Sequence, residues 1–299
     1  GVATPIPGHT EGAKFKMSGM CAMFSKHTIA TNCDFSGLMQ VDSQFTVGDS
    51  IHFGGYGGYG AGRYDITNST FSGTIIYSEN CSHSGGFVDI SGFLGYAAHS
   101  DATMVQTFTN SGVTKSGVIR VAGDVTNAKA LYVGGIIATT SSKNTQVAMN
   151  GCYNLGSITL TKDVETTGGI YVGGIYSVRT STSTSSNCTL TGCYNEGDIV
   201  VDAKSSTNMC IGGICAYTSM LNATSSEAYP KFYNKGNIKV GTNLTKEEMT
   251  NYTAQLVVGG FLGLMNNNVK KNFDADFQNQ GDITVKNVKT PKCSVGGIW

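Results

Sequence analysis

Two short motifs decide the fold: Cys193-Tyr-Asn-Glu-Gly-Asp-Ile199 and, further along, Ile211-Gly-Gly-Ile214. Both motifs recur. The first has copies at residues 152–158, 193–199, 232–238 and 277–283, and the second at 133–136, 172–175, 211–214, 258–261 and 295–298. The second glycine of the second motif can be followed back to Gly19, at intervals of 36 to 47 residues. A period of this size indicates a stacked array in which no unit buries its apolar face alone.

Each unit is predicted to consist of β-strands. Apolar and polar residues alternate after each Asn-x-Gly, as in residues 197–202 and 281–286, which is typical of half-buried strands. We interpret Asn-x-Gly as a turn, because both residues tolerate positive φ. This predicted turn ladder consists of Asn154, Asn195, Asn234, Asn279, Gly156, Gly197, Gly236 and Gly281.

Two all-β arrays fit a unit of roughly 40 residues. A β-propeller blade has this length, but it needs four strands and the units show fewer. Like residues (Asn, Gly, Ile, Tyr) recur at equivalent positions, which favours stacking in register. We therefore predict a right-handed parallel β-helix (a solenoid), with a β-propeller as the alternative. A coil of about 20 residues would make each unit two coils, with equivalent residues roughly 9.6 Å apart and a rod on the order of 70 Å long.

The repeat predicts a single domain over residues 14–299, preceded by a lead-in or cap over residues 1–13 and continuing beyond Trp299. The chain carries 20 Lys and Arg against 20 Asp and Glu. Without a basic stripe, a nucleic-acid partner is not expected. No apolar run reaches the roughly 18 residues of a membrane span, so none is predicted.

No motif predicts catalysis, a metal site or a cofactor. The nine cysteines include no Cys-x-x-Cys motif, so no zinc or redox site is predicted. We expect buried free thiols. Two coils per unit would put Cys152 and Cys193 too far apart to form a disulfide. The five histidines, among them His52, show no ligand spacing and are expected in turns or on the surface. The closest acidic cluster, Asp274-Ala-Asp276, is flanked by lysines and is interpreted as a solvated loop.

The strongest departure from the repeat is residues 51–65, where glycines alternate with aromatic residues. With little bulk to shield them, these aromatic rings are predicted to be exposed, as on recognition surfaces. The candidate ligand-binding residues are Tyr56, Tyr59, Arg63 and Tyr64.

The pairing of Cys-Tyr-Asn-x-Gly-x-Ile with Val-Gly-Gly-Ile resembles the GLUG-type repeat. The chain is similar to β-helical regions of large bacterial cell-surface proteins, particularly of gut-dwelling Bacteroidetes, closely over residues 130–299 and loosely over 14–130. Such proteins include adhesins and IgA-cleaving metallopeptidases, but the zinc signature His-Glu-x-x-His is absent.

The resemblance implies an extracellular β-helix. We expect a secreted or cell-surface, non-enzymatic structural or adhesive segment that contacts a glycan or glycoprotein, joined to other domains of the same polypeptide and able to self-associate. The alternatives are a carbohydrate-active β-helix (a polysaccharide lyase or hydrolase), which would need clustered carboxylates at a groove, and a structural fibre or surface-assembly component.

Overall fold

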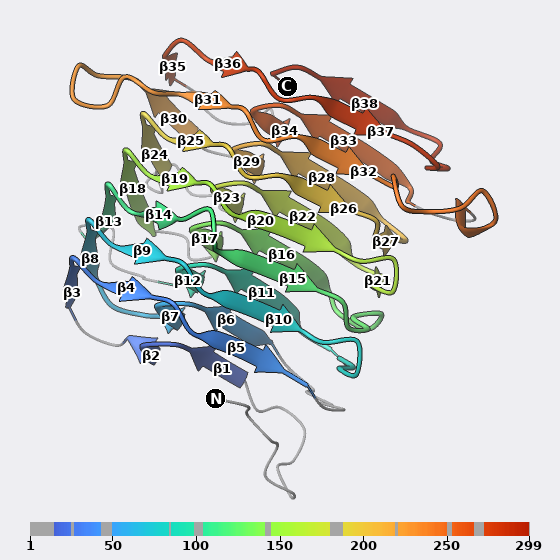
Figure 1. The fold of residues 1–299 in the computed structure, drawn as a ribbon, viewed down its shortest axis with the longest axis horizontal. Helices are drawn as coiled ribbons and strands as arrows, with labels where there is room; N and C mark the ends of the chain where they lie inside the picture. Colours follow the sequence, from blue (N-terminus) through green and yellow to red (C-terminus); the bar gives the residue numbers. More distant parts are fainter. Residues whose placement is uncertain are drawn as a thin grey trace, which may run out of the picture.

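The chain winds as a parallel β-solenoid whose coils stack from the N-terminal end to the C-terminal end (Figure 1). The computed structural model describes residues 15–24, 27–42, 50–83, 85–98, 104–140, 145–179, 188–218, 221–249, 253–265 and 272–298. Leu131 pairs with Ile170, and Ile170 pairs with Met209, so one turn takes 39 residues. Every pairing between strands of neighbouring coils in the described ranges is parallel, which confirms the β-helix and shows that the propeller alternative is wrong.

Five sheets, named A to E here, run along the solenoid and contain these strands. Sheet A consists of β5 (Leu38–Val41), β10 (Thr74–Tyr77), β15 (Val118–Val121), β20 (Ser157–Leu160), β26 (Ile199–Val201), β32 (Ile238–Val240) and β37 (Ile283–Val285). Sheet B consists of β1 (Phe15–Ser18), β6 (Ile51–Gly54), β11 (Phe87–Ser91), β16 (Ala130–Gly134), β22 (Gly169–Gly173), β28 (Asn208–Gly212), β33 (Gln255–Gly259) and β38 (Cys293–Gly296). Sheet C consists of β2 (Cys21–Phe24), β7 (Gly57–Gly60), β12 (Leu94–Ala97), β17 (Ile137–Thr140), β23 (Tyr176–Arg179), β29 (Cys215–Thr218) and β34 (Leu262–Met265).

Sheet D consists of β3 (Thr28–Thr31), β8 (Tyr64–Thr67), β13 (Val105–Thr109), β18 (Gln146–Asn150), β24 (Cys188–Thr191), β30 (Leu221–Thr224) and β35 (Asn272–Asp274). Sheet E consists of β4 (Asp34–Phe35), β9 (Thr70–Phe71), β14 (Gly112–Val113), β19 (Tyr153–Asn154), β25 (Tyr194–Asn195), β31 (Tyr233–Asn234) and β36 (Gln278–Asn279). A sixth, two-stranded sheet pairs β21 (Glu165–Thr166) with β27 (Lys204–Ser205). The short helix η1 (Glu247–Met249) interrupts the pattern, and no helix in the described ranges is long and apolar enough to cross a membrane.

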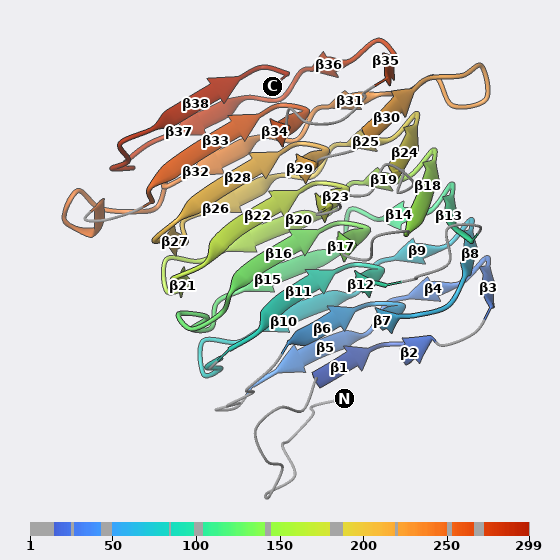
Figure 2. The ribbon, with the colours of Figure 1, turned by 180° about the vertical axis from the view of Figure 1, so that it is seen from behind.

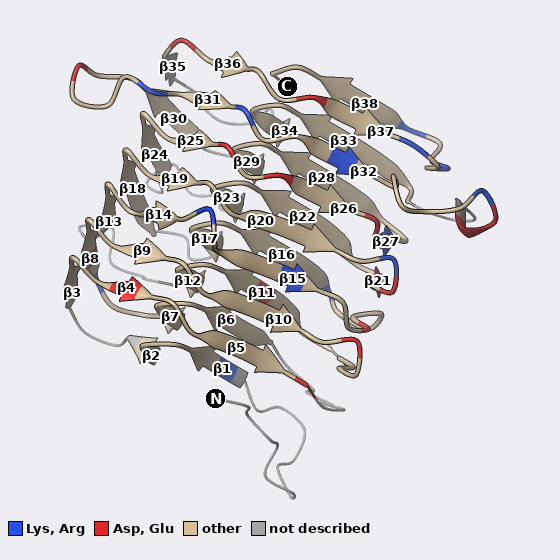
Figure 3. Ribbon diagram, viewed as in Figure 1, with Lys and Arg blue, Asp and Glu red and all other residues tan. Residues whose placement is uncertain are grey.

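Each coil passes through sheets B, C, D, E and A in that order. Sheets A and B face each other, with A in front in Figure 1 and B in front in Figure 2, and sheet D closes one side. The interior is filled by ladders of like apolar residues. One such ladder in sheet A is fully buried and consists of Ile119, Ile158, Ile199 and Ile238. Figure 3 shows that charges of both signs are scattered, mostly near strand ends and connections.

The prediction of two coils per unit is wrong. The Asn-x-Gly and Gly-Gly motifs lie at two corners of the same coil, because the coil contains five short strands instead of the two or three that the alternation suggested. Equivalent residues in successive units are therefore direct neighbours across parallel strands, about 4.8 Å apart. The eight strands of sheet B then span roughly 35 Å, half the predicted length.

The asparagine ladder exists, but for a different reason from the one predicted. Asn154 donates from Nδ2 to Oδ1 of Asn195 at 2.8 Å, Asn195 donates to Asn234 at 2.7 Å, and Asn234 donates to Asn279 at 2.8 Å. These asparagines lie in strands and do not have positive φ. Their side chains point inward and satisfy one another, as buried polar groups must.

The glycines of both motifs are required because neighbouring coils approach closely. A Cβ on Gly197 would lie 1.7 Å from the carbonyl oxygen of Gly156, and one on Gly174 would lie 2.0 Å from that of Gly213. Side chains are therefore excluded at these corners whatever the local φ.

Most of the cysteines are buried free thiols, as expected, but the separation of Cys152 and Cys193 differs from expectation. The described cysteines are free, and Cys152 and Cys193 lie buried in adjacent coils. Burial and the neighbouring Cys152 thiol raise the pKa of Cys193 well above its ordinary value. The conclusion that these two residues are too far apart to bond was wrong, because it rested on two coils per unit. Residues 1–13, the predicted cap, lie outside the described residues.

Candidate functional site

The glycine-rich stretch 51–65 does not present its tyrosines to solvent as predicted. Tyr56 is 1% exposed; its ring stacks on Phe93 with centroids 4.5 Å apart, and its hydroxyl lies 2.6 Å from the carbonyl oxygen of Cys33. Tyr64 is fully buried, and a Cβ on Gly60 would lie 1.5 Å from its hydroxyl oxygen. The prediction that these two rings are exposed is wrong, because the glycines make room for rings that fill the core.

The other two candidates lie on the outside of the coil but do not converge. Tyr59 is half-buried and stacks on Tyr96 at 5.3 Å between ring centroids, with the Lys16 ammonium 4.4 Å from its centroid. Arg63 is exposed and pairs with Asp65 at 2.9 Å. The four residues therefore do not form one patch, and ligand binding by Tyr59 or Arg63 stays a prediction.

A buried His–Asp pair joins the neighbouring strands β6 and β11 of sheet B. His52 Nδ1 is 2.7 Å from Asp89 Oδ2, and the two side chains are 3% and 0% exposed. His52 is thus not the surface histidine that was expected. The Tyr59 and Tyr96 rings lie 5.4 and 4.7 Å from the imidazole, and burial raises the pKa of Asp89. The surrounding rings leave this pair little access to solvent.

A tyrosine ladder runs along the outer face of sheet E. Tyr153 and Tyr194 stack with centroids 5.6 Å apart, and Tyr194 lies 5.1 Å from Tyr233. Each tyrosine precedes an inward-facing asparagine, so strand alternation turns the ring outward. All three tyrosines are half-buried.

One coil adds a loop beside this ladder. Residues 225–232 separate β30 from β31, whereas only residues 192 and 193 separate the equivalent strands β24 and β25. The loop projects from the left edge of Figure 1. Within it, the amide of Tyr229 donates to the carbonyl oxygen of Ser226 at 3.0 Å, and the Ser226 amide donates back at 3.3 Å. This closed turn holds Tyr229 against the preceding coils.

Two glycines make room for Tyr229. Gly151 and Gly192 occupy the corner between sheets D and E with φ of 61° and 57°, a conformation that favours glycine. A Cβ on Gly151 would lie 2.7 Å from the Tyr229 ring, and one on Gly192 would lie 2.2 Å from the Tyr229 carbonyl oxygen. Asn110, with φ of 47°, occupies the same corner one coil earlier.

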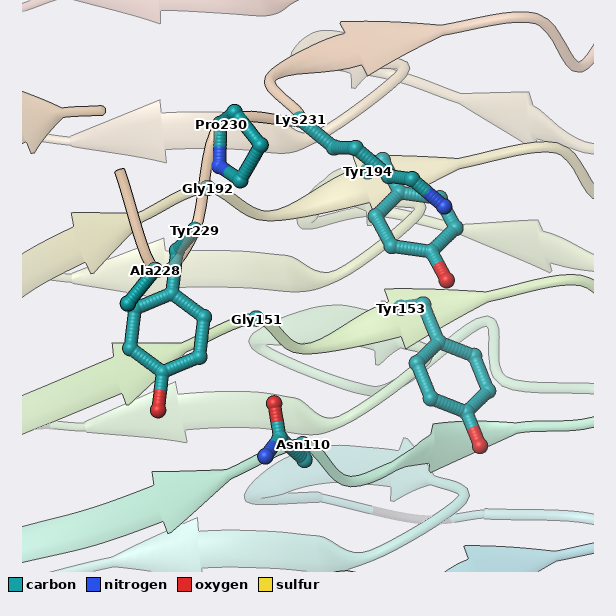
Figure 4. A pocket seen from close by; sticks show the side chains of 9 residues that line it. All are labelled: Asn110, Gly151, Tyr153, Gly192, Tyr194, Ala228, Tyr229, Pro230 and Lys231. Atoms are coloured by element: carbon teal, nitrogen blue, oxygen red, sulfur yellow. The ribbon is translucent and has the colours of Figure 1, made fainter. Parts of the chain in front are cut away.

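These elements enclose a pocket of about 220 Å³ (Figure 4). Tyr229 forms one wall, Tyr153 and Tyr194 form the other, and Gly151 lies between them with Asn110 at one end. The remaining lining residues are Gly192, Ala228, Pro230 and Lys231. The pocket is smaller than the roughly 300–1,000 Å³ of drug-sized sites, so it suits a single ring.

The pocket offers hydrogen-bond donors. Burial raises the pKa of Tyr153 and of Tyr194 above the ordinary value of 10, so both phenols stay protonated at neutral pH. The Lys231 ammonium lies 5.1 Å from the Tyr194 ring centroid. At the far end of the ladder, the Tyr233 hydroxyl donates to Glu196 at 2.7 Å.

Tyrosine recurs in the Cys-Tyr-Asn motif, but this recurrence alone does not predict the pocket. One signal was present: if the asparagine of Cys-Tyr-Asn faces inward, the tyrosine must face outward. A second was the extra residues 225–231, which lie immediately before the third copy of the motif.

The acidic candidates occupy separate positions. Asp276 is exposed, as expected for a loop. Asp198 binds Lys239 at 3.0 Å and the Asn237 amide at 3.0 Å, so it joins two coils. Among the residues that the structure describes, no three His, Cys, Asp or Glu side chains are grouped so that they could hold a metal ion.

The chain is thus a β-helix. Glycines form its corners, a ladder of asparagines lies inside it, and a pocket lined by tyrosines lies on its outer face. Comparison with family models, with curated proteins and with solved structures found no match to this chain.

Proposed function

We propose that the protein is an extracellular, non-enzymatic adhesive segment that binds one ring of a glycan between Tyr229 and the pair Tyr153–Tyr194. The observation that carries the proposal is the pocket itself: three tyrosine rings from two parts of the chain meet around a floor cleared by two glycines. Tyrosine offers both an apolar ring for a sugar face and a hydroxyl for its polar edge.

The character of the pocket supports binding over hydrolysis. Hydrolysis of a glycosidic bond needs a pair of carboxyl groups flanking the bond. The lining of the pocket contains no Asp, Glu or His. Catalysis by a lyase or hydrolase site elsewhere, and a role as a fibre or surface-assembly component, stay alternative predictions.

The solenoid suits display. Its coils present the same outer positions at a repeat of about 4.8 Å, so a ligand chain lying along the axis would meet successive tyrosines. As part of this proposal, the chain is a GLUG-type repeat region of a large bacterial surface protein. It self-associates or contacts further domains of that protein. In this role the solenoid is a rigid arm that holds a small binding site away from the cell.

The proposal can be tested with a glycan array followed by titration calorimetry on the best-bound oligosaccharide. Tyr153→Ala and Tyr229→Ala should each weaken binding at least about ten-fold, as expected for an aromatic hot spot. Tyr59→Ala is the matched control, because it removes an outer tyrosine from another face. Equal binding by the wild type and both pocket variants would refute the proposal; loss only in Tyr59→Ala would move the site to residues 51–65.

A further inference from the structure

The pocket is rich in donors and carries no negative charge on its walls. The phenol hydroxyls of Tyr153, Tyr194 and Tyr229 can donate, as can the carboxamide of Asn110 and the ammonium of Lys231. Against these five groups, the side-chain acceptors of the lining are the same hydroxyls and one amide oxygen. A ligand that satisfies the pocket therefore presents more acceptors than donors.

Lys231 is the charged group of the lining. In the part of the chain that the structure describes, it forms no ion pair, and its ammonium lies over the Tyr194 ring. Glu196 and Glu227 are not among the residues that line the pocket. Glu196 accepts a hydrogen bond from Tyr233, and Glu227 is exposed. The ammonium is thus available to an anion held between the tyrosine walls.

The arrangement selects for shape as well as charge. A carboxylate next to Lys231 forms a charge-assisted hydrogen bond, which is about twice as strong as a neutral one. The walls require a ring attached to that carboxylate, because the volume of about 220 Å³ accepts one ring and the tyrosine faces are apolar. A free inorganic anion would satisfy the charge and leave the walls empty.

We propose that the pocket binds a carboxylated sugar ring, with Lys231 as the partner of the carboxylate and the tyrosines as the walls. This inference rests on the proposed function and narrows it to acidic glycans. Two kinds of sugar carry this chemistry, the uronic acids of polysaccharides and the sialic acids of glycoproteins.

The experiment compares each acidic sugar with its methyl ester, which keeps the ring and removes the charge. Trigalacturonate and 3′-sialyllactose, each beside its fully methyl-esterified form, are titrated into the wild-type protein by calorimetry at low and at high salt. We expect one of the two acids to bind at least about five-fold more tightly than its neutral counterpart, with a preference that shrinks as salt screens the charge. The acid that binds identifies the source.

The variants assign this preference to one residue. Lys231→Met keeps the aliphatic length and should abolish the preference for the acid, while Lys231→Arg should retain it. Lys235→Met is the matched control, since Lys235 lies 4.4 Å from the Tyr233 ring centroid and does not line the pocket. Its binding should match that of the wild type.

The outcomes separate the two proposals. Equal binding of acid and ester that still requires Tyr153 overturns the charge preference and leaves the glycan site standing. A preference that survives Lys231→Met, or is lost in Lys235→Met, also overturns the assignment. Binding of none of the four ligands, with none found on the array, overturns both.

Discussion

Residues 51–65 and the pocket around Tyr229 both combine tyrosines with glycines, yet two tyrosines of the first stretch lie inside the solenoid wall and those of the pocket lie outside it. Tyr56 and Tyr64 fill the core, while Tyr153 and Tyr194 stand on its outer face. In the first region glycines make room for rings inside the coil, and in the second they make room for a ring that arrives from another coil. The position of a residue relative to strand alternation, and not local composition, decides whether a tyrosine can meet a ligand.

The largest expected effect comes from removing an interior ring. Tyr56→Ala should lower the free energy of unfolding by about 3–5 kcal/mol, because it leaves a cavity and removes the hydroxyl from two carbonyl oxygens. Tyr153→Ala, on the outer face, should cost less than about 1.5 kcal/mol. Urea denaturation of both variants measures the difference. Equal losses would show that the two regions are not distinguished as inside and outside.

The next effect compares an inward residue of β25 with the residue that follows this strand. Asn195→Ala removes the partner of Asn154 and Asn234 and leaves buried polar groups without one, at a cost of about 1–3 kcal/mol. Glu196→Ala changes the neighbouring outward residue and should stay within about 1 kcal/mol. A larger loss for Glu196→Ala in the same denaturation experiment would argue against the inward ladder.

Gly192→Ala tests the corner that admits Tyr229. An alanine at φ of 57° costs about 1–2 kcal/mol, and its Cβ would displace the loop, so glycan binding should fall with stability. Gly241→Ala is the control: Gly241 has φ of 65°, and a Cβ there would lie 2.2 Å from the Lys286 carbonyl oxygen. Gly241 follows β32 of sheet A, so it occupies a different corner of the coil from Gly192. Calorimetry should find its glycan affinity unchanged. Matching affinities for the two variants would separate the pocket from this corner.

The smallest effect is a pH dependence on the surface of the first region. Burial alone would raise the pKa of Asp65, but the hydrogen bonds from His27 and Arg63 more than offset it and hold the pKa below its ordinary value. A lowered carboxyl pKa contributes stability that is present above the unfolded value of about 3.9 and is lost as pH falls through the folded value. Asp65→Asn should therefore lower the free energy of unfolding, measured by urea denaturation, by less than about 1 kcal/mol at pH 6 and leave it unchanged at pH 2. An equal shift at both values would contradict a role for its charge.

Much of the fold could be predicted from two motifs. Recurrence of Asn195 and its equivalents predicted a stacked ladder, and recurrence of Gly174 and its equivalents predicted a repeat over nearly the whole chain. The coil length was missed because two corners of one coil look like two coils when the strands between them are only two to five residues long. The asparagines were assigned to turns because their residue type favours positive φ, whereas inter-coil hydrogen bonds hold them in strands.

The candidate site was less accessible to sequence reasoning. Tyr56 was predicted to bind a ligand because glycines surround it, but the same glycines allow close packing between coils. The pocket depends on Tyr229 crossing to Gly151, a contact between residues 78 positions apart in the sequence (229 − 151). No local pattern encodes that contact.

By itself, the sequence determined the repeat, the all-β character, the glycine corners and the identity of each ladder, because these follow from local alternation and from the period of the motifs. Only the tertiary structure decided that one unit is one turn, which tyrosines face solvent, and where the extra loop lands. Those features depend on the number of residues in one coil, and that number is set by packing across the whole coil.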